Sequence, residues 1–363
     1  MSDKRPLTRS RLVRGAAAGA GAALAVGWAA QHRLVARTRS TPQDIEAEGL
    51  TVPPDCVQHV VEVDDGGRIH VVERGQGPAV VLLHGYMLSG ALWAHQLRDL
   101  AEHHRVIVPD LRGHGSSVPG TSGFSSVAAP GPVAELRADA RMAAAQEGSP
   151  GVRRLAVDVR AVLDTLEVEH ALVVGHSMGG MVALQLVHDM GREELHRRVA
   201  GLALVSTTAG PFTRLPGLGG MARVARPVSA RAVSLADRLG VSALGSQDLR
   251  WWLTRLGFGA DAPPAQVRFV EGLHLATPSA TVIDLLPSLA LFDLSKWLGS
   301  VELPVLVVVG SHDRLTPPRH ALRTASALAH SELVELPRCG HMPMIERRRE
   351  FTRLIEEFMA KIG

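Results

Sequence analysis

The sequence predicts an α/β fold in which a mostly parallel sheet of about eight strands is flanked by helices. After Asp55, short β-branched runs alternate with longer helical patterns, which is typical of βαβ units. Runs such as Ala79–Leu83 and Ala171–Val174 are continuously apolar, which indicates strands that are covered on both faces. The chain of 363 residues is 46% hydrophobic and 21% charged, a composition that excludes a disordered chain.

The order of the expected elements follows from these patterns. Two strands, Cys56–Val63 and Arg68–Arg74, flank an Asp-Asp-Gly-Gly sequence that suits a tight antiparallel hairpin. Strands are then expected at Ala79–Leu83, Val106–Val108, Ala171–Val174, Leu202–Val205, Val305–Val309 and Leu333–Leu336. Helices are expected between and after them at Gly90–His103, Val152–Leu166, Ser177–Met190, Pro318–Ala329 and Glu346–Ile362.

Two segments interrupt this alternation. Residues 118–150 are rich in Ala, Gly, Pro and Ser and include a short predicted helix at 134–146. Residues 211–299 are helical in pattern and too long for a loop, so we expect an inserted helical cap. The predicted organisation is a basic and apolar segment with a linker at 1–54, a core in two parts at 55–210 and 300–363, and the cap at 211–299.

The basic charge of the chain lies in its first residues. Residues 1–40 hold eight basic side chains and one acid, a net charge of +7, whereas the rest holds 31 basic and 35 acidic side chains, a net charge of −4. The positive balance therefore does not indicate a nucleic-acid partner.

The charges surround an uncharged run of Ala and Gly at Gly15–Ala30. As a helix it would span about 24 Å, somewhat less than the ~30 Å hydrocarbon core of a bilayer. We expect membrane association through residues 15–30 as an uncleaved anchor, with the body outside the cytoplasm. A cleaved secretory signal and a soluble tail are the alternatives.

The strongest chemical motif is G-x-S-x-G at residues 175–179. It follows an apolar run and precedes a helical pattern, which is the strand–turn–helix context that this motif requires. Gly175 and Gly179 allow the strand and helix to approach closely. We therefore predict Ser177 as a nucleophile at a helix N-terminus, where the helix dipole favours negative charge.

A serine nucleophile needs a base and a carboxylate that orients the base. His341 follows the last predicted strand and Asp313 follows the strand before it. The carboxyl ends of parallel strands meet at one edge of a sheet, so both should lie near Ser177. Asp284 and Asp293 are rival acids, but they fall in the helical insert.

The same edge offers donors for an oxyanion. His84-Gly85-Tyr86 follows the strand that ends at Leu83, and Gly85 permits a tight turn. We expect the backbone N–H groups of Tyr86 and Met178 to form the oxyanion hole, and His84 to support the loop by hydrogen bonds to nearby backbone.

Four other residues are expected to be structural. Asp110 and Arg112 should brace loops around the site, and Cys56 and Cys339 should pack as small buried side chains. The sequence contains no phosphate-binding glycine loop and no cluster with metal-ligand spacing, so no cofactor or metal ion is expected.

These motifs, in this order, resemble the α/β-hydrolase superfamily over about residues 57–363. The chain looks like the bacterial serine-hydrolase branch, carboxylesterase- or lipase-like, with a helical cap; cofactor-free haloperoxidases and carbon–carbon bond hydrolases also belong there. The resemblance implies a nucleophile, an acid, a base and two oxyanion donors at Ser177, Asp313, His341, Tyr86 and Met178. Residues 118–150 depart from it, because most relatives have a shorter connection there.

The expected function is hydrolysis of a small-molecule or lipid-like carboxylic ester through an acyl-enzyme. An apolar acyl group is expected from large side chains in the cap, Trp251, Trp252, Leu256 and Phe258. Carbon–carbon bond hydrolysis, acyl transfer and perhydrolysis by the same triad are alternatives, as is a non-catalytic interaction protein on the same scaffold. Ser177 disfavours the branches that use an aspartate nucleophile.

Overall fold

The computed structural model describes residues 49–124, 150–210 and 247–363, and its centre is one eight-stranded sheet. The strand order is β1-β2-β4-β3-β5-β6-β7-β8. β2 pairs antiparallel with both β1 and β4, and the remaining pairs are parallel. This confirms the predicted fold class. The strands are β1 Val57–Glu62, β2 Arg68–Arg74, β3 Ala79–Leu83, β4 Arg105–Pro109, β5 Ala171–His176, β6 Val199–Val205, β7 Val305–Gly310 and β8 Ser331–Leu336.

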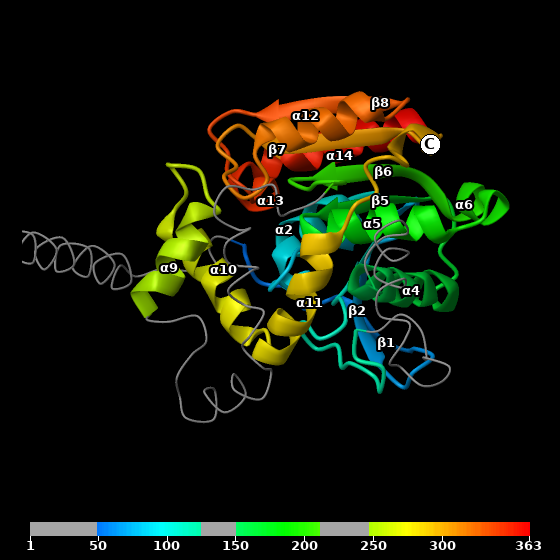
Figure 1. Cartoon of the computed structure of the whole chain (residues 1–363), viewed down its shortest axis with the longest axis horizontal. Helices are drawn as coiled ribbons and strands as arrows, with labels where there is room; N and C mark the ends of the chain where they lie inside the picture. The colour runs from blue at the N-terminus through cyan, green and yellow to red at the C-terminus, as the bar shows by residue number, and fades with distance from the viewer. Residues whose placement is uncertain (1–48, 125–149, 211–246) are drawn as a thin grey trace, which may run out of the picture.

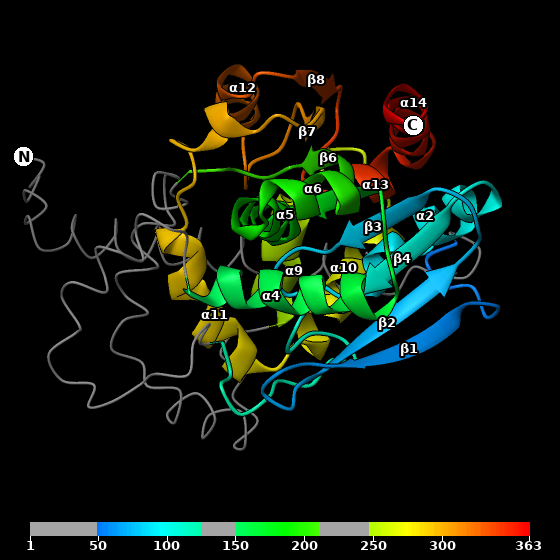
Figure 2. The same ribbon diagram turned by 90° about the vertical axis from the view of Figure 1, so that its right-hand side faces the viewer.

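Helices cover both faces of this sheet. Figure 2 shows α4, α5 and α12 on one side of the strands and α2 and α14 on the other. Helices α9 and α10 lie beside the edge toward which the arrows of β6, β7 and β8 point (Figure 1). The helices are α2 Ala94–Asp99, α4 Pro150–Thr165, α5 Met178–Asp189, α6 Arg192–Arg198, α9 Gln247–Leu256, α10 Pro264–Ala276, α11 Ser279–Leu291, α12 Pro318–Ala327, α13 Pro343–Glu346 and α14 Arg348–Ile362.

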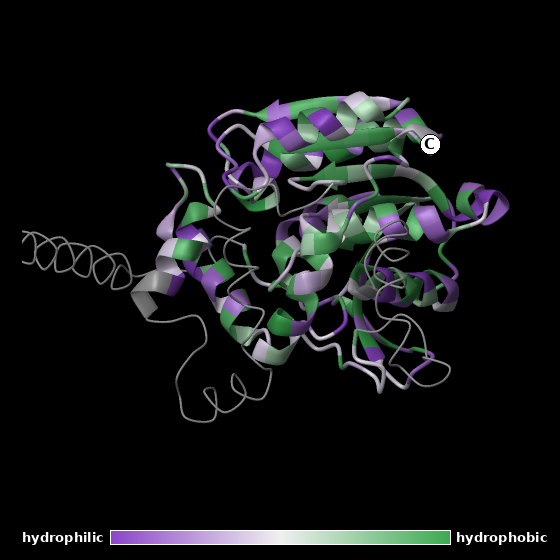
Figure 3. Ribbon diagram, viewed as in Figure 1, coloured by the Kyte–Doolittle hydropathy of each residue, from purple (hydrophilic) through white to green (hydrophobic). Residues whose placement is uncertain are grey.

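The central strands are buried on both faces because successive side chains point to opposite sides. In β3, Val81 and Leu83 join the apolar cluster that contains α4 and α5, whereas Val80 and Leu82 join the cluster that contains α2 and α14. Figure 3 shows the central strands as mostly hydrophobic ribbon, with hydrophilic residues on the outer helices. Continuous apolar runs therefore correctly identified doubly covered strands.

Two predicted helices are broken in the structure. The segment expected as one helix at 90–103 consists of a 3₁₀ turn at Gly90–Trp93, then α2, then a second 3₁₀ turn at Leu100–Glu102. The final helix begins earlier than predicted, at Pro343, and is interrupted at Arg347, whose φ of −127° and ψ of 42° are not helical. The predicted helix at 134–146 lies outside the described residues.

The described residues cover only part of the predicted cap and none of the N-terminal run. Helices α9, α10 and α11 occupy the chain between β6 and β7, while residues 211–246 lie outside the description, so the cap boundaries stay a prediction. Residues 15–30 also lie outside it. Within the described ranges, no helix combines the length and apolarity needed to cross a membrane.

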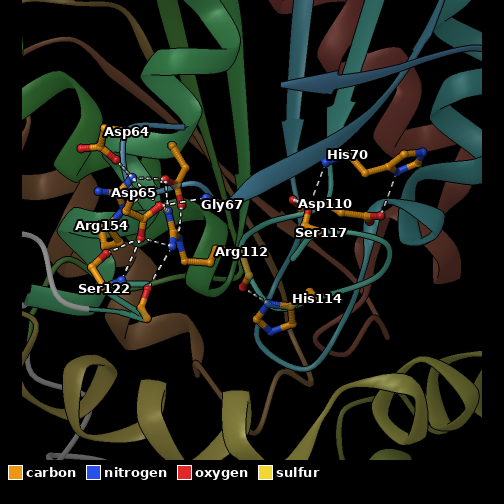
Figure 4. A network of polar contacts seen from close by, with 12 residues as sticks. Asp64, Asp65, Gly67, His70, Asp110, Arg112, His114, Ser117, Ser122 and Arg154 are labelled. Atoms are coloured by element: carbon orange, nitrogen blue, oxygen red, sulfur yellow. Dashed lines mark hydrogen bonds and ion pairs between the residues drawn. The ribbon is translucent and has the colours of Figure 1, made fainter. Parts of the chain in front are cut away.

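A buried ion network joins the β1–β2 turn to the loop after β4 and to α4 (Figure 4). The fully buried guanidinium of Arg112 donates to both carboxylate oxygens of Asp158, at 2.7 and 2.8 Å, and to both of Asp65, at 2.8 and 2.9 Å. Arg154 also donates to Asp158, at 2.7 Å. Hydrogen bonding by Arg112 holds the pKa of Asp65 well below its usual range. The expected bracing role of Arg112 is confirmed.

Replacing Arg112 with Ala should therefore destabilise the fold strongly. The substitution leaves Asp65 and Asp158 without their main partner, and breaking a buried pair in this way costs about 3–5 kcal/mol. The matched control is Arg192→Ala, which removes an ion pair with Glu302 in which both side chains are exposed and should cost less than about 1 kcal/mol. Urea denaturation followed by circular dichroism measures both; equal costs would contradict the importance of the network.

Candidate active site

Ser177 lies in a strained turn between β5 and α5. Its φ of 52° and ψ of −114° fall in a region that non-glycine residues rarely adopt and that costs about 1–3 kcal/mol. Hydrogen bonds hold this turn: Ser177 N–H donates to Val205 at 2.9 Å, and its carbonyl accepts from the Thr207 hydroxyl at 2.6 Å. A strained serine that the surroundings hold so firmly is typical of a functional position.

The glycines on either side of the turn are required by close packing. A Cβ on Gly175 would lie 2.4 Å from the carbonyl oxygen of Gly179, and a Cβ on Gly179 would lie 2.3 Å from that of Leu83. Both distances are far shorter than any real Cβ contact. Glycine at these two positions therefore leaves room for the strand and the helix, and the second contact places the start of α5 against the end of β3.

Asp313 and His341 lie together at the ends of β7 and β8. His341 Nδ1 is 2.8 Å from Asp313 Oδ2, and both side chains are buried. The same carboxylate accepts the N–H groups of Leu315 and Thr316, at 2.9 and 2.8 Å, and the Thr316 hydroxyl at 2.9 Å. A carboxylate that only accepts fixes the proton of His341 on Nδ1, which leaves Nε2 with a free lone pair.

His341 is held against the residue that precedes Ser177. The ring centroids of His176 and His341 are 4.8 Å apart, and His176 Nε2–H donates to the His341 carbonyl at 2.9 Å. Burial, and next the charge of His341, lower the pKa of His176 well below its usual range, so its ring stays neutral. Sequence reasoning missed this role, although the position between Gly175 and Ser177 was visible.

The loop after β3 is held by histidines of fixed tautomer. His84 Nδ1–H donates to the Gly85 carbonyl at 2.8 Å, while Nε2 accepts the Leu111 N–H at 2.9 Å. Burial lowers the pKa of His84, which is consistent with this neutral form. A Cβ on Gly85 would lie 2.9 Å from His176 Nδ1, so the loop rests on the residue next to Ser177. These are the hydrogen bonds to nearby backbone that were expected of His84, and its supporting role in a reaction stays a prediction.

Neighbouring residues extend this support. His114 Nε2 accepts the Met87 N–H at 3.3 Å, and burial lowers the pKa of His114 to about 3. Asp110 accepts the N–H groups of Gly90 and Ser116, at 2.7 and 2.9 Å, and bonds His70 at 3.1 Å (Figure 4). The bracing role predicted for Asp110 is therefore confirmed.

Helix α11 closes over this loop. The Tyr86 hydroxyl donates to the carbonyl of Val282, and burial raises the pKa of that hydroxyl. The Thr281 hydroxyl donates to the Gly113 carbonyl at 3.1 Å. The side chain of Tyr86 thus links the loop after β3 to the cap. The predicted oxyanion-hole role of Tyr86 and Met178 is separate, because it involves only their backbone N–H groups.

The large apolar residues of the cap mostly pack into the protein. Trp251 and Phe258 are buried in the cluster that contains α2 and α14, and Leu256 is exposed. Trp252 makes an edge-to-face contact with Trp251, at a centroid distance of 5.0 Å. These contacts are those of a cap that packs on the core, and an apolar acyl pocket stays a prediction.

The larger of two cavities lined by the described residues lies away from the predicted triad. A cavity of about 640 Å³ opens at the opposite edge of the sheet, where β3 and β5 begin, and its lining includes none of the predicted catalytic residues. In the part of the chain that the structure describes, no group of three His, Cys, Asp or Glu side chains could hold a metal ion. Cys56 and Cys339 are free thiols. The expectation of burial is confirmed for Cys339 and wrong for Cys56, which is only partly buried because it directly precedes β1 at the edge of the sheet.

Comparisons with known proteins agree with this architecture. A family model described as alpha/beta hydrolase fold matches residues 78–348. The chain is 27% identical over 304 residues to the AB hydrolase superfamily protein YisY of Bacillus subtilis, covering 83% of this chain and 98% of that protein. It is 27% identical over 306 residues to a 2-hydroxy-6-oxo-6-phenylhexa-2,4-dienoate hydrolase of Burkholderia cepacia, covering 81% and 91%. An esterase structure from Exiguobacterium antarcticum superposes with a TM-score of 0.66 at 21% identity, covering 83% and 99%.

The pairing of Asp313 with His341 predicts how Ser177 reacts. Asp313→Asn should slow the reaction of Ser177 with a p-nitrophenyl phosphonate by about 10³–10⁴-fold, because the imidazole loses its orienting carboxylate. The control is Asp293→Asn. Asp293 accepts the N–H of Ser295 at 3.0 Å, and its replacement should leave the rate of phosphonate reaction within about twofold of the parent rate. Release of p-nitrophenol measures both rates. A slow Asp293 variant with a fast Asp313 variant would contradict the assignment.

Proposed function

This chain belongs to the alpha/beta hydrolase fold family, and we propose that it is a serine hydrolase that cleaves carboxylic esters through an acyl-enzyme. The observation that carries the proposal is the buried Asp313–His341 hydrogen bond of 2.8 Å, held against the residue that precedes the strained Ser177. The three residue types are those of a nucleophile, a general base and an orienting acid.

The proposed reaction uses the free nitrogen of His341. Its Nε2 takes the proton of the Ser177 hydroxyl as the oxygen attacks the ester carbonyl, and then gives that proton to the leaving alcohol. Asp313 stays ionised and stabilises the imidazolium through Nδ1–H. A water molecule, activated by the same Nε2, then releases the acid and restores Ser177.

The negative oxygen that develops on the carbonyl needs preorganised donors. We assign this role to the backbone N–H groups of Met178 and Tyr86. Met178 begins α5, where the helix dipole favours negative charge. Tyr86 belongs to the loop that His84 supports and that contacts His176 through Gly85.

A carbon–carbon bond hydrolase is the second candidate. The observation that favours it is the 27% identity, over most of both chains, with the hydrolase of 2-hydroxy-6-oxo-6-phenylhexa-2,4-dienoate. The same residues would serve that reaction, which differs in having a carbon leaving group. We favour ester cleavage, because an alcohol leaving group needs only the proton that His341 carries. The large apolar side chains of the cap are the support for an apolar acyl group.

The proposal predicts hydrolysis of p-nitrophenyl esters, tested with acyl chains from two to sixteen carbons. Ser177→Ala should lower the rate at least about 10³-fold, because it removes the nucleophile. The matched control is Ser206→Ala, since Ser206 also has a positive φ, of 46°, at a strand end but is fully buried. Its rate should stay within about threefold.

Three outcomes of this series would count against the proposal. Absence of hydrolysis at every chain length, or an unchanged rate in Ser177→Ala, would contradict ester cleavage by this site. Cleavage of a 2-hydroxy-6-oxo-dienoate with no cleavage of esters would instead support the second candidate.

We also propose that residues 15–30 associate with the membrane and leave the body outside the cytoplasm. The support is the concentration of positive charge on both sides of that uncharged run. The full chain should then fractionate with membranes after an alkaline carbonate wash, and external protease should degrade its body in spheroplasts. A mature N-terminus near Ala30 in the soluble extracellular fraction would contradict an uncleaved anchor.

A further inference from the structure

The backbone of His341 is held at both of its polar groups. Its N–H donates to the carbonyl of Gly257, which follows α9, at 2.6 Å, and its carbonyl accepts from His176 Nε2 at 2.9 Å. The side chain is held in turn by Asp313. Three elements therefore meet at this one residue: the cap linker, the end of β5 and the loop after β7.

The residues on either side of His341 share one further partner. The N–H groups of Gly340 and Met342 donate to the same oxygen, Oε1 of Glu346, at 2.9 and 3.2 Å. Glu346 is the last residue of α13, and its own N–H donates to the Met342 carbonyl at 2.9 Å. One carboxylate oxygen thus binds the backbone N–H groups immediately before and after His341.

The second oxygen of Glu346 reaches the cap. Oε2 accepts the N–H of Gly259, in the linker between α9 and α10, at 2.7 Å. The His341 loop and the α9–α10 linker are packed backbone against backbone, because a Cβ on Gly340 would lie 2.5 Å from the Gly259 nitrogen. Arg255 holds the same linker by donating to the Gly259 carbonyl at 2.7 Å.

The charge of Glu346 also acts on this loop. Burial raises the pKa of Glu346, while the N–H groups that it accepts and the nearby His341 act in the opposite direction. The three backbone N–H groups that donate to Glu346 stabilise its ionised, carboxylate form. A negative charge so close to His341 also favours the imidazolium form that arises when Ser177 loses its proton.

We propose that Glu346 is a positioning residue, which fixes the backbone on both sides of His341 and ties it to the cap linker. The inference rests on the proposed function, since His341 is placed there as the general base. Glu346 contacts no reacting atom. Its action is to keep Nε2 of His341 aligned with Ser177 and to add a second negative charge near the imidazolium, beyond that of Asp313.

The first test is Glu346→Gln, which has nearly the same shape. The amide oxygen can accept from only one of the two segments, and the amide NH₂ then faces the N–H of the other. A small misplacement of a catalytic group costs about 10–100-fold, so kcat should fall by this factor while KM changes less than about threefold. The matched control is Glu350→Gln, which removes a charge from the first turn of α14 and should leave kcat within about twofold.

The second test does not depend on turnover. The imidazole protons of His341 are titrated by NMR in Ser177→Ala and in Ser177→Ala/Glu346→Gln. The midpoint should fall by about half a pH unit or more in the double variant, because a nearby negative charge is lost. The other titratable groups near this imidazole, the carboxylate of Asp313 and the rings of His176 and His274, are the same in both proteins.

The outcomes separate the two proposals. An unchanged kcat together with an unchanged His341 midpoint in folded Glu346→Gln would overturn the positioning role. If the parent protein cleaves no ester, ester hydrolysis fails, and the NMR pair still tests Glu346. If Glu346→Gln does not fold, Glu346→Asp replaces it: the charge stays but the shorter chain cannot reach both segments, so kcat should fall with little change in the midpoint.

Discussion

The approach of helix α5 to the end of β3 is the constraint on which the rest of the site depends. Glycine at 175 and 179 permits this approach, and any Cβ there would collide with backbone. The same packing forces Ser177 into a positive φ and brings the loop at Gly85 against His176. Backbone contacts thus set the position of Ser177 and of the predicted oxyanion donors, and the side chains of Thr207 and His176 complete the packing around them.

Neutral histidines then hold the loops that this packing brings together. His84, His114 and His176 each bond a backbone group, and burial lowers the pKa of each. A neutral imidazole is both a donor and an acceptor, so it can join two loops without the cost of burying a charge. A buried charged side chain, by contrast, has oppositely charged partners: Arg112 lies between Asp65 and Asp158.

Much of the fold and the central site could be predicted because their signals are local. A doubly covered strand is a short apolar run, and the turn at Ser177 is a five-residue motif. Asp313 and His341 were predicted from the strands they follow. The contact of His176 with His341 and the contact of Glu346 with Gly259 could not be predicted this way, because each joins residues far apart along the chain. The breaks around α2 and at Arg347 leave no trace in the apolar periodicity, which only reports the buried face of a helix.

The sequence by itself determined the order of strands and helices, the residue types available for catalysis and the strand end that each would follow. It could do so because hydrophobic periodicity and glycine spacing are properties of neighbouring residues. Only the tertiary structure decided that Asp313 bonds His341 directly, which histidines stay neutral, and that one glutamate joins the loop of His341 to the cap. Those outcomes depend on hydrogen bonds between segments that the folded sheet alone brings within 3 Å or so.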